Sequence, residues 1–193
     1  MNHKSTAASP LTVFAAAVAT IGSTAPVAGK TKKDTVAEHL KTFDTLDFDV
    51  FSNQKWDRLH ESHSDDIAFV WPDGHETKGI SKHIENMKRM FVYAPNTSIK
   101  AHPVKFGSGD WTLVIGEMTG TFSRPMPMPD GKSIPPTGKS FKIPVATIGH
   151  WKDGKMNKEY MFWDDQSFMK QIGIVSALPP AREFAQGVTR LKM

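Results

Sequence analysis

The sequence predicts an α+β domain in which helices come first and an antiparallel sheet follows. Apolar residues recur at helical spacing in the first half, for example at Ile80, Ile84 and Met87, and alternate with polar residues in the second half, as over 140–151. The chain has 193 residues, 39% of them hydrophobic, which is enough for one sizeable core. Helices and strands that are separated along the chain in this way are typical of an α+β fold.

The first half contains the expected helices and one short strand. In a helix over 34–49, Asp34 is a suitable N-cap. The turn residues Pro72-Asp73-Gly74 stop the strand, and Pro95 closes the last helical segment. The expected elements are, in order, helices over 34–49 and 56–63, a strand over 67–71 and a helix over 81–91.

The second half reads as a meander of strands and a final short helix that ends at Gly173. Residues 107–110 predict a hairpin, whereas 124–138 contains five prolines and cannot be a central strand. This long segment is either a functional flap or a mobile excursion. The expected strands cover residues 99–106, 111–122, 140–151 and 156–164.

Composition and charge exclude several classes of function. The net charge of +4 is spread over segments of mixed sign, so no nucleic-acid partner is expected. The chain has no cysteine, which excludes disulfides, thiolate nucleophiles and cysteine-ligated metals.

The amino-terminal segment 1–28 has the layout of a secretory signal peptide, with Lys4 before an apolar run over 11–21 and small residues after it. The run is too short to cross a bilayer, so no membrane partner is expected once the leader is removed. This interpretation predicts a periplasmic or secreted protein; a disordered leader is the alternative. The pocket domain is expected over 29–174, followed by a tail over 175–193.

The register of the last hairpin decides which side chains share a face. A three-residue turn around Gly154 places Lys152 opposite Met156, whereas a two-residue turn shifts the pairing by one residue and mixes the faces. We therefore expect the three-residue turn, with Glu159 on an apolar face. The expected pairs are Gly149 with Glu159, Thr147 with Met161, and Val145 with Trp163.

Glu159 and His83 are the candidate proton carriers, and each has an ordinary alternative. A desolvated Glu159 has a raised pKa and can exchange protons at neutral pH, but a glutamate near a strand edge can also reach water past Gly149. His83 lies at the border of an apolar helical stripe, where a packed or half-exposed histidine is the other interpretation.

Several further side chains could line a cavity or belong to an ordinary core or surface. His60 and His63 could share a metal, but no third ligand is evident, so we predict no metal, and His102 has no assigned role. His75, next to the turn, could also face solvent. The candidate binding residues are Trp71, His75, Met87, Thr147, Met161 and Trp163, with Met90 as a further lining residue.

Two blocks of sequence resemble the SnoaL-like polyketide cyclase (ester cyclase) family of the nuclear transport factor 2-like superfamily. They are 149–173, with Gly-His-Trp-Lys-Asp-Gly-Lys and Glu-Tyr-Met-Phe-Trp-Asp-Asp, and 71–79, which begins Trp-Pro-Asp-Gly. The resemblance implies a cone-shaped, curved antiparallel sheet wrapped around the N-terminal helices, with one deep pocket. It also implies ring closure by intramolecular aldol condensation, with neither a cofactor nor a metal.

The resemblance does not carry the family's catalytic residues onto this chain. The acid/base aspartate falls at Met161 and an assisting histidine at Thr147, and methionine cannot transfer a proton. Glu159 is one pleat away on the same face, about 7 Å along the strand, and could take over the role.

Two functions follow as hypotheses. One is a cofactor-independent cyclase, isomerase or hydrolase that acts on a small apolar carbonyl compound, and the other is a non-catalytic binder of a hydrophobic small molecule. Ile148, Tyr160 and Phe162 lie on the opposite face of the last hairpin and predict a homodimer.

Overall fold

The computed structural model describes residues 32–174. The predictions for the leader (1–28) and the tail (175–193) lie outside the described residues. Within 32–174, no helix combines the length and the apolar character that a membrane crossing requires.

The N-terminal helices form one continuous path. The α-helix α1 (Lys32–Thr45) runs directly into the π-helical segment η1 (Leu46–Phe51), and the short 3-10 helix η2 (Trp56–Glu61) follows. Asp34 lies inside α1 and is therefore not an N-cap. In η1 the backbone hydrogen bonds join residues five apart, as from Ser52 N–H to Asp47 O at 3.3 Å. Segments of this kind are frequent at functional sites.

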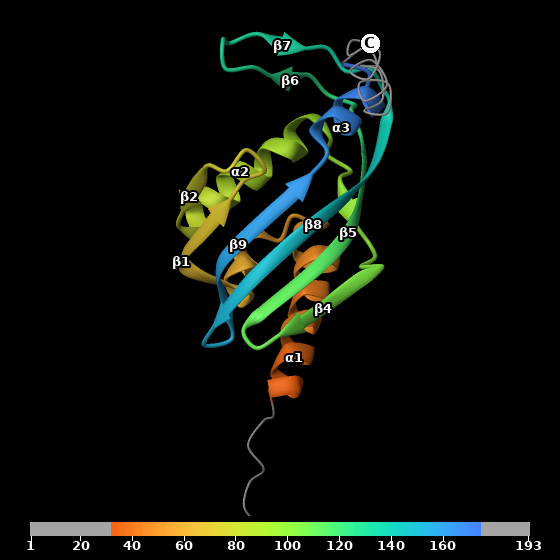
Figure 1. Cartoon of the computed structure of the whole chain (residues 1–193). Coiled ribbons are helices and arrows are strands. Elements are labelled where there is room, and N and C mark those ends of the chain that lie inside the picture. Colours follow the sequence, from red (N-terminus) through yellow and green to blue (C-terminus); the bar gives the residue numbers. More distant parts are fainter. Residues whose placement is uncertain (1–31, 175–193) are drawn as a thin grey trace, which may run out of the picture.

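The main sheet is curved and does not close (Figure 1). It is antiparallel except that β1 and β9 run parallel. Residues Lys100 to Pro103 interrupt the predicted 99–106 strand and separate β3 from β4, both of which pair with β5. In spatial order the strands are β2 (Glu76–Lys78), β1 (His63–Val70), β9 (Lys155–Trp163), β8 (Ser140–Lys152) and β5 (Trp111–Thr121), then β3 (Ser98–Ile99) and β4 (Val104–Ser108).

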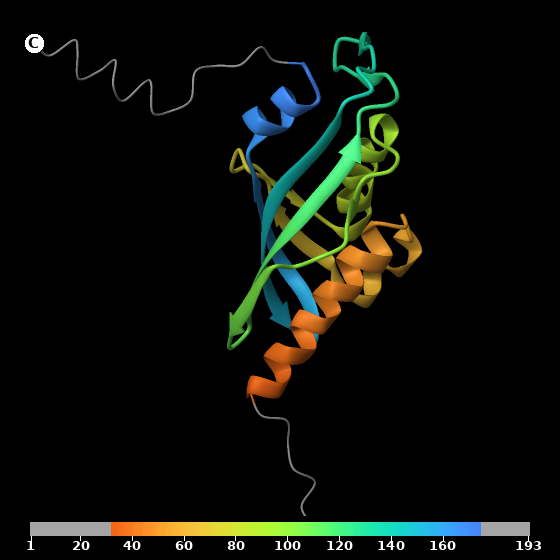
Figure 2. The same ribbon diagram turned by 90° about the vertical axis from the view of Figure 1, so that its right-hand side faces the viewer.

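Helices cover one side of this sheet. Figure 2 shows α1 and α2 (Ile80–Tyr93) on the same side of the long strands. The last helix, α3 (Asp165–Gln171), begins at the N-cap Asp164, whose Oδ1 accepts hydrogen bonds from the backbone N–H groups of Gln166 and Ser167. The predicted α+β fold with N-terminal helices and a curved sheet is confirmed.

The proline-rich segment forms a small ribbon apart from the main sheet. Strands β6 (Met126–Pro127) and β7 (Ser133–Ile134) pair with each other and project beyond α3 in Figure 1. Met126 is buried in the apolar core cluster that contains Phe141 and Phe168, and Ile134 packs against that cluster. These contacts anchor the ribbon at its base. The prediction that this segment is no central strand is confirmed.

The turn of the last hairpin differs from the prediction, although the pairing at the site does not. Lys152 pairs with Lys155 around a two-residue turn, in which Asp153 and Gly154 have φ values of 52° and 76°. Positive φ at both positions is the mark of a type I′ turn. The predicted three-residue turn is therefore wrong.

A β-bulge then restores the expected faces. Between the pairs Trp151–Met156 and His150–Lys158, β9 carries Asn157 as one extra residue. Beyond the bulge every pair is the predicted one: Gly149 with Glu159, Thr147 with Met161, and Val145 with Trp163.

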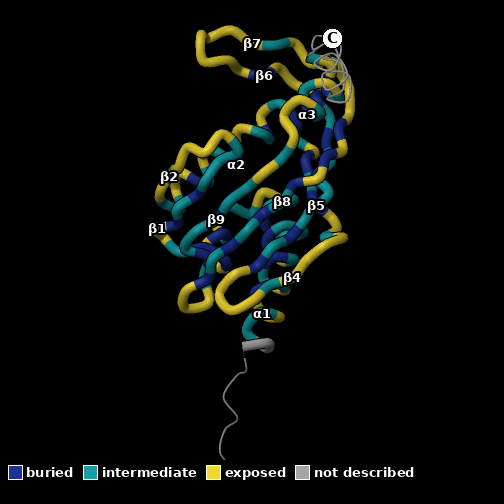
Figure 3. Tube along the Cα trace, viewed as in Figure 1, coloured by how far each residue is buried: buried dark blue, intermediate teal, exposed yellow. Residues whose placement is uncertain are grey.

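The core consists of two apolar clusters. One lies between α1, η2 and the sheet and includes Phe43, Leu59 and Trp151; the other includes Phe141 and Phe168, under α3. Buried and more exposed residues alternate along β5 and β8, as Figure 3 shows. One face of the sheet therefore carries the core and the other faces outward.

The outward face keeps apolar side chains partly exposed. Ile148 pairs with Leu113 on one side and with Tyr160 on the other, and Trp111 and Phe162 are 44% and 43% exposed. The homodimer expected from this face stays a prediction.

We expect Gly149→Ala to lower the free energy of unfolding by about 1–3 kcal/mol, because an added methyl group overpacks the core. A Cβ at this position would lie 2.6 Å from Met156 Sδ and 3.1 Å from Phe43 Cε2. Urea denaturation measures the change, with Lys152→Ala at the exposed end of β8 as the control. A Gly149→Ala protein as stable as that control would contradict the close packing.

If the outward face is a dimer interface, light scattering will give twice the mass of one chain. Replacing both Trp111 and Phe162 with lysine should then produce monomers, because charges disrupt an apolar contact. Val92→Lys, at an exposed apolar residue on α2, is the control. A monomeric mass for the unmodified protein would contradict the prediction.

Candidate functional site

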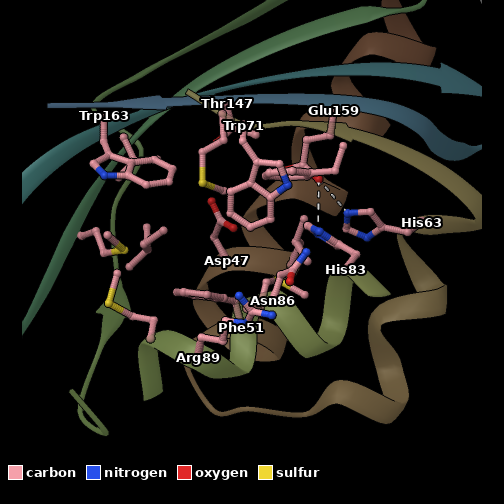
Figure 4. Close-up of a pocket in the computed structure, with 18 of the residues that line it drawn as sticks. Asp47, Phe51, His63, Trp71, His83, Asn86, Arg89, Thr147, Glu159 and Trp163 are labelled. Carbon is pink, nitrogen blue, oxygen red and sulfur yellow. Dashed lines mark hydrogen bonds and ion pairs between the residues drawn. The ribbon is translucent and has the colours of Figure 1, made fainter. Parts of the chain in front are cut away.

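A cavity of about 300 Å³ lies between the sheet, α2 and η1 (Figure 4). This volume is at the lower end of the range for small-molecule sites. Both apolar clusters contribute to its wall, through Leu46 and Val145 for example. The eight predicted site residues all line it: Trp71, His75, His83, Met87, Thr147, Glu159, Met161 and Trp163.

Glu159 is a buried carboxylate in the cavity wall. It is 3% exposed, and its Oε2 lies 2.9 Å from His63 Nε2. Met156 and Phe43 fill the space beside Gly149, through which a solvated glutamate would have to reach water. The solvated alternative is therefore wrong. A buried carboxylate is costly without partners, and His63 supplies one.

His63 is held for this contact by the end of η2. Its Nδ1 lies 2.8 Å from Ser62 Oγ, and the same hydroxyl lies 3.1 Å from Leu59 O. The hydroxyl has one proton, so it donates either to the carbonyl or to the imidazole. In both arrangements one proton lies between His63 Nε2 and Glu159, either on the ring or on the carboxyl group. Sequence reasoning considered His63 only as a metal ligand and missed this contact.

His83 approaches the same carboxylate from α2. Its Nε2 lies 3.7 Å from Glu159 Oε2, and its ring packs 4.4 Å from that of Phe69. Burial, and then the nearby His63, lower the pKa of His83 well below 6.5, so the ring is neutral at pH 7. His83 Nδ1 is buried and makes no hydrogen bond within the described part of the chain.

His63, His83 and Glu159 form the only group among residues 32–174 that could hold a metal ion. Two histidines and a carboxylate suit zinc or iron. However, His63 and Glu159 are already at hydrogen-bond distance, and His83 Nδ1 lacks the partner that usually orients a metal-bound histidine. His63 and Glu159 form a hydrogen-bonded pair, and His83 Nε2 lies 3.7 Å from the same carboxylate oxygen. His60 is exposed, with Nδ1 2.6 Å from Asp57 O, and does not join it.

A second acid, Asp47, enters the cavity from η1 (Figure 4). Its Oδ2 lies 2.8 Å from His102 Nε2, and its side chain is 13% exposed. Burial raises the pKa of Asp47 against the opposing effect of His102, and the charge of Glu159 raises it further. Sequence reasoning missed Asp47 and gave His102 no role; the only signal was that Asp44 and Asp47 are spaced to share one side of a helix.

The remaining lining residues make the cavity largely apolar. Trp71 stacks on His75, with ring centroids 5.7 Å apart, and donates a hydrogen bond to Thr77. Asn86 and Arg89 of α2 add polar groups that sequence reasoning did not select. The roles of the predicted binding residues stay predictions.

Known proteins that resemble this chain share its architecture. The family model described as SnoaL-like polyketide cyclase matches residues 41–172. No protein with a curated description matches the sequence.

Three solved structures show the fold. A candidate SnoaL-like polyketide cyclase from Jannaschia sp. CCS1 is 19% identical, with a TM-score of 0.65 over 77% of this chain and 100% of that one. IdmH, a candidate polyketide cyclase from Streptomyces antibioticus, is 16% identical, with a TM-score of 0.60 over 70% and 98%. A protein with a ketosteroid isomerase-like fold from Catenulispora acidiphila, in complex with trimethylamine, is 14% identical, with a TM-score of 0.56 over 75% and 99%.

We expect the free energy of unfolding to fall as the pH drops below 6.5, and His83→Gln to reduce this dependence. The unfolded chain protonates this residue near pH 6.5, whereas the folded protein holds it neutral to a much lower pH, so acid favours unfolding. The contribution of one such group is at most about 1.4 kcal/mol per pH unit.

Urea denaturation between about pH 5 and pH 8 measures this contribution as the difference between the two proteins. The difference is needed because His102 has a raised pKa and acts in the opposite direction, losing its stabilising effect as the pH rises above 6.5. His60→Gln, at an exposed site, is the control. Equal pH dependence in the wild type and His83→Gln would contradict the prediction.

Proposed function

The chain belongs to the SnoaL-like polyketide cyclase family, and we propose that it catalyses cyclisation or isomerisation of a small apolar carbonyl compound by proton transfer. One observation carries the proposal: the buried Glu159, hydrogen-bonded to His63 Nε2 at 2.9 Å, faces an apolar cavity. A buried acid that faces a mostly apolar cavity with few polar groups is a typical candidate for acid/base chemistry.

In this reaction Glu159 removes a proton from the carbon next to a carbonyl group. The electron pair of the broken C–H bond forms an enolate, which can attack a second carbonyl carbon of the same molecule. The new C–C bond closes a ring, and the carbonyl oxygen that becomes a hydroxyl group takes up a proton. No oxidant or reductant is consumed. With the shared proton on His63 Nε2, Glu159 is ionised and can accept the carbon-bound proton, and the Nε2–H group donates to it before and after the transfer.

The position of the acid distinguishes this chain from the pattern that the family resemblance implies. Met161 and Thr147 occupy the expected acid and histidine positions, and they pair across β8 and β9. Glu159 lies two residues before Met161 on the same face, beside His63 and His83. The geometry therefore favours proton transfer at the end of the cavity nearest η2.

A non-catalytic binder of a hydrophobic molecule is the alternative, and the apolar wall around Trp71, Met87 and Trp163 favours it. Native mass spectrometry of freshly purified protein distinguishes the two. A retained small molecule without any proton exchange would support the binder. The proposal of a periplasmic or secreted location rests on the segment 1–28 alone.

The test uses 2-tetralone, a flat apolar ketone, in deuterated water, with deuterium uptake at its α-carbons followed by mass spectrometry. We expect the wild type to accelerate uptake and Glu159→Gln to reduce kcat by about 10²- to 10⁴-fold, because an amide cannot accept the proton. His60→Gln, outside the cavity, is the matched control.

Two outcomes would contradict the proposal. Full activity of Glu159→Gln would show that this acid does not carry the proton. Loss of activity on treatment with a chelator, recovered by adding zinc or iron, would instead assign the His63–His83–Glu159 cluster to a metal ion.

A further inference from the structure

A chain of four polar side chains connects the cavity with the protein surface. His102 Nε2 lies 2.8 Å from Asp47 Oδ2, His102 Nδ1 lies 2.9 Å from Asp44 Oδ1, and Lys105 Nζ lies 2.6 Å from Asp44 Oδ2. The exposed fractions of the side chains rise outward from 1% at His102 to 28% at Asp44 and 40% at Lys105. Each neighbouring pair is at hydrogen-bond distance, so the path has no gap.

Three elements build this chain. The helical path from α1 into η1 places Asp44 and Asp47 three residues apart, on one side. The interruption between β3 and β4 brings His102 to them, and the Phe48 ring packs 4.6 Å from the imidazole. The Phe43 ring also packs against the imidazole edge-on, with ring centroids 6.5 Å apart. The imidazole is held in one orientation.

The two ring nitrogens of His102 both face carboxyl groups. If both carboxyl groups are ionised, the ring must be an imidazolium that donates from Nδ1 and Nε2. If Asp47 is protonated, it donates to Nε2, and the neutral ring donates from Nδ1 to Asp44. The two states differ only in the position of one proton between Asp47 Oδ2 and His102 Nε2. This pair can therefore give up and recover a proton with almost no movement of heavy atoms.

Asp47 shares the cavity with Glu159, and its charge environment differs. Burial raises the pKa of Asp47, its partner His102 opposes this effect, and Glu159 and His63 act on it through their charges. His102 faces Asp44 and Asp47, and these carboxylates raise its pKa although burial alone would lower it. Two acids in different environments can divide the roles of proton acceptor and proton donor. The hydrogen bond to His102 uses Oδ2, which leaves Oδ1 for the cavity.

We propose that Asp47 is a second catalytic acid, which gives a proton to the carbonyl oxygen of the bound compound and is reloaded from the surface through His102 and Asp44. The inference rests on the proposed function for its substrate class. As Glu159 takes the carbon-bound proton, the new O–H bond receives its proton from Asp47. With Asp47 protonated on Oδ1 and His102 an imidazolium, the Asp47 carboxylate left after donation takes the Nε2 proton of the ring through Oδ2, and one proton from water restores the imidazolium. Glu159 releases to water the proton that it took, so the full cycle changes neither charge nor oxidation state.

His102 is a positioning and proton-supplying residue, since it touches Asp47 and not the cavity. Its loss should therefore act through Asp47. We expect Asp47→Asn to reduce kcat for deuterium exchange of 2-tetralone by about 10²- to 10⁴-fold, with a smaller change in KM. His102→Gln should lower kcat and alter its pH dependence. In the double variant the two effects should not add, because both act on one proton.

The matched control is Asp49→Asn. Asp49 lies on η1 two residues after Asp47 but pairs with Lys55 and Arg58, outside the cavity. We expect its exchange rate to equal that of the wild type. An Asp47→Asn protein within about threefold of Asp49→Asn, well short of the loss expected for a missing acid, would overturn the role of Asp47. If Glu159→Gln is inactive in the same experiment, the proposed function stands while this inference fails.

A second measurement does not depend on turnover. The carboxyl carbon of Asp47 and the ring nitrogens of His102 can be followed by NMR in the full-length protein labelled with ¹³C and ¹⁵N, without ligand. We expect the two groups to titrate together and His102→Gln to shift the titration of Asp47, whereas Asp49→Asn leaves it in place. An Asp47 that titrates independently of His102 would overturn the relay, whatever the outcome for the ketone. Absence of exchange in the wild type would overturn both proposals.

Discussion

The pairing of β9 between two neighbours of opposite direction controls the whole site. On one side β9 runs parallel to β1, which carries His63, and on the other it runs antiparallel to β8, which supplies Gly149 opposite Glu159. A carboxylate with 3% exposure must be hydrogen-bonded, because an unpaired buried charge costs several kcal/mol. A shift of β9 by one residue would turn Glu159 outward and place Tyr160 in the cavity wall. The strand register therefore decides which side chains line the cavity.

Much of this register could be predicted from the sequence, although for an incomplete reason. The alternation of apolar residues along 140–151 predicted that Glu159 shares a face with the apolar residues of the neighbouring strand. The observed pairs Gly149–Glu159, Thr147–Met161 and Val145–Trp163 agree with this. The turn itself differs from the prediction. Asp153 and Gly154 form a two-residue turn, which alone would shift the strand pairing by one residue, and the extra residue Asn157 in β9 reverses that shift. A bulge leaves no clear pattern in a single sequence, since it adds one residue whose side chain only has to tolerate exposure.

The partners of the buried acids could not be predicted in the same way. His63 meets Glu159 across 96 residues of sequence, through a parallel pairing that hydrophobic periodicity does not specify. His102 lies in an irregular stretch between β3 and β4 that the sequence predicted as continuous strand. Local patterns identify which residues share a helix or a strand face; contacts between separate elements follow only from the topology. The helix over 81–91 and its end before Pro95 could be predicted, because such features depend only on residues that are close in the sequence.

The direction of β1 has a consequence for how the protein folds. Two parallel strands cannot be joined by a short turn, and β9 follows α2 and most of the other strands in the sequence. The pairing of β1 with β9 can therefore form only after those elements have been synthesised. Forming such a long-range contact is entropically slow and comes after local structure. We therefore expect His63 and Glu159 to meet late in folding, and a chain shortened before β9 would lack Glu159. The buried His63–Glu159 contact and the central sheet are therefore expected to be completed together.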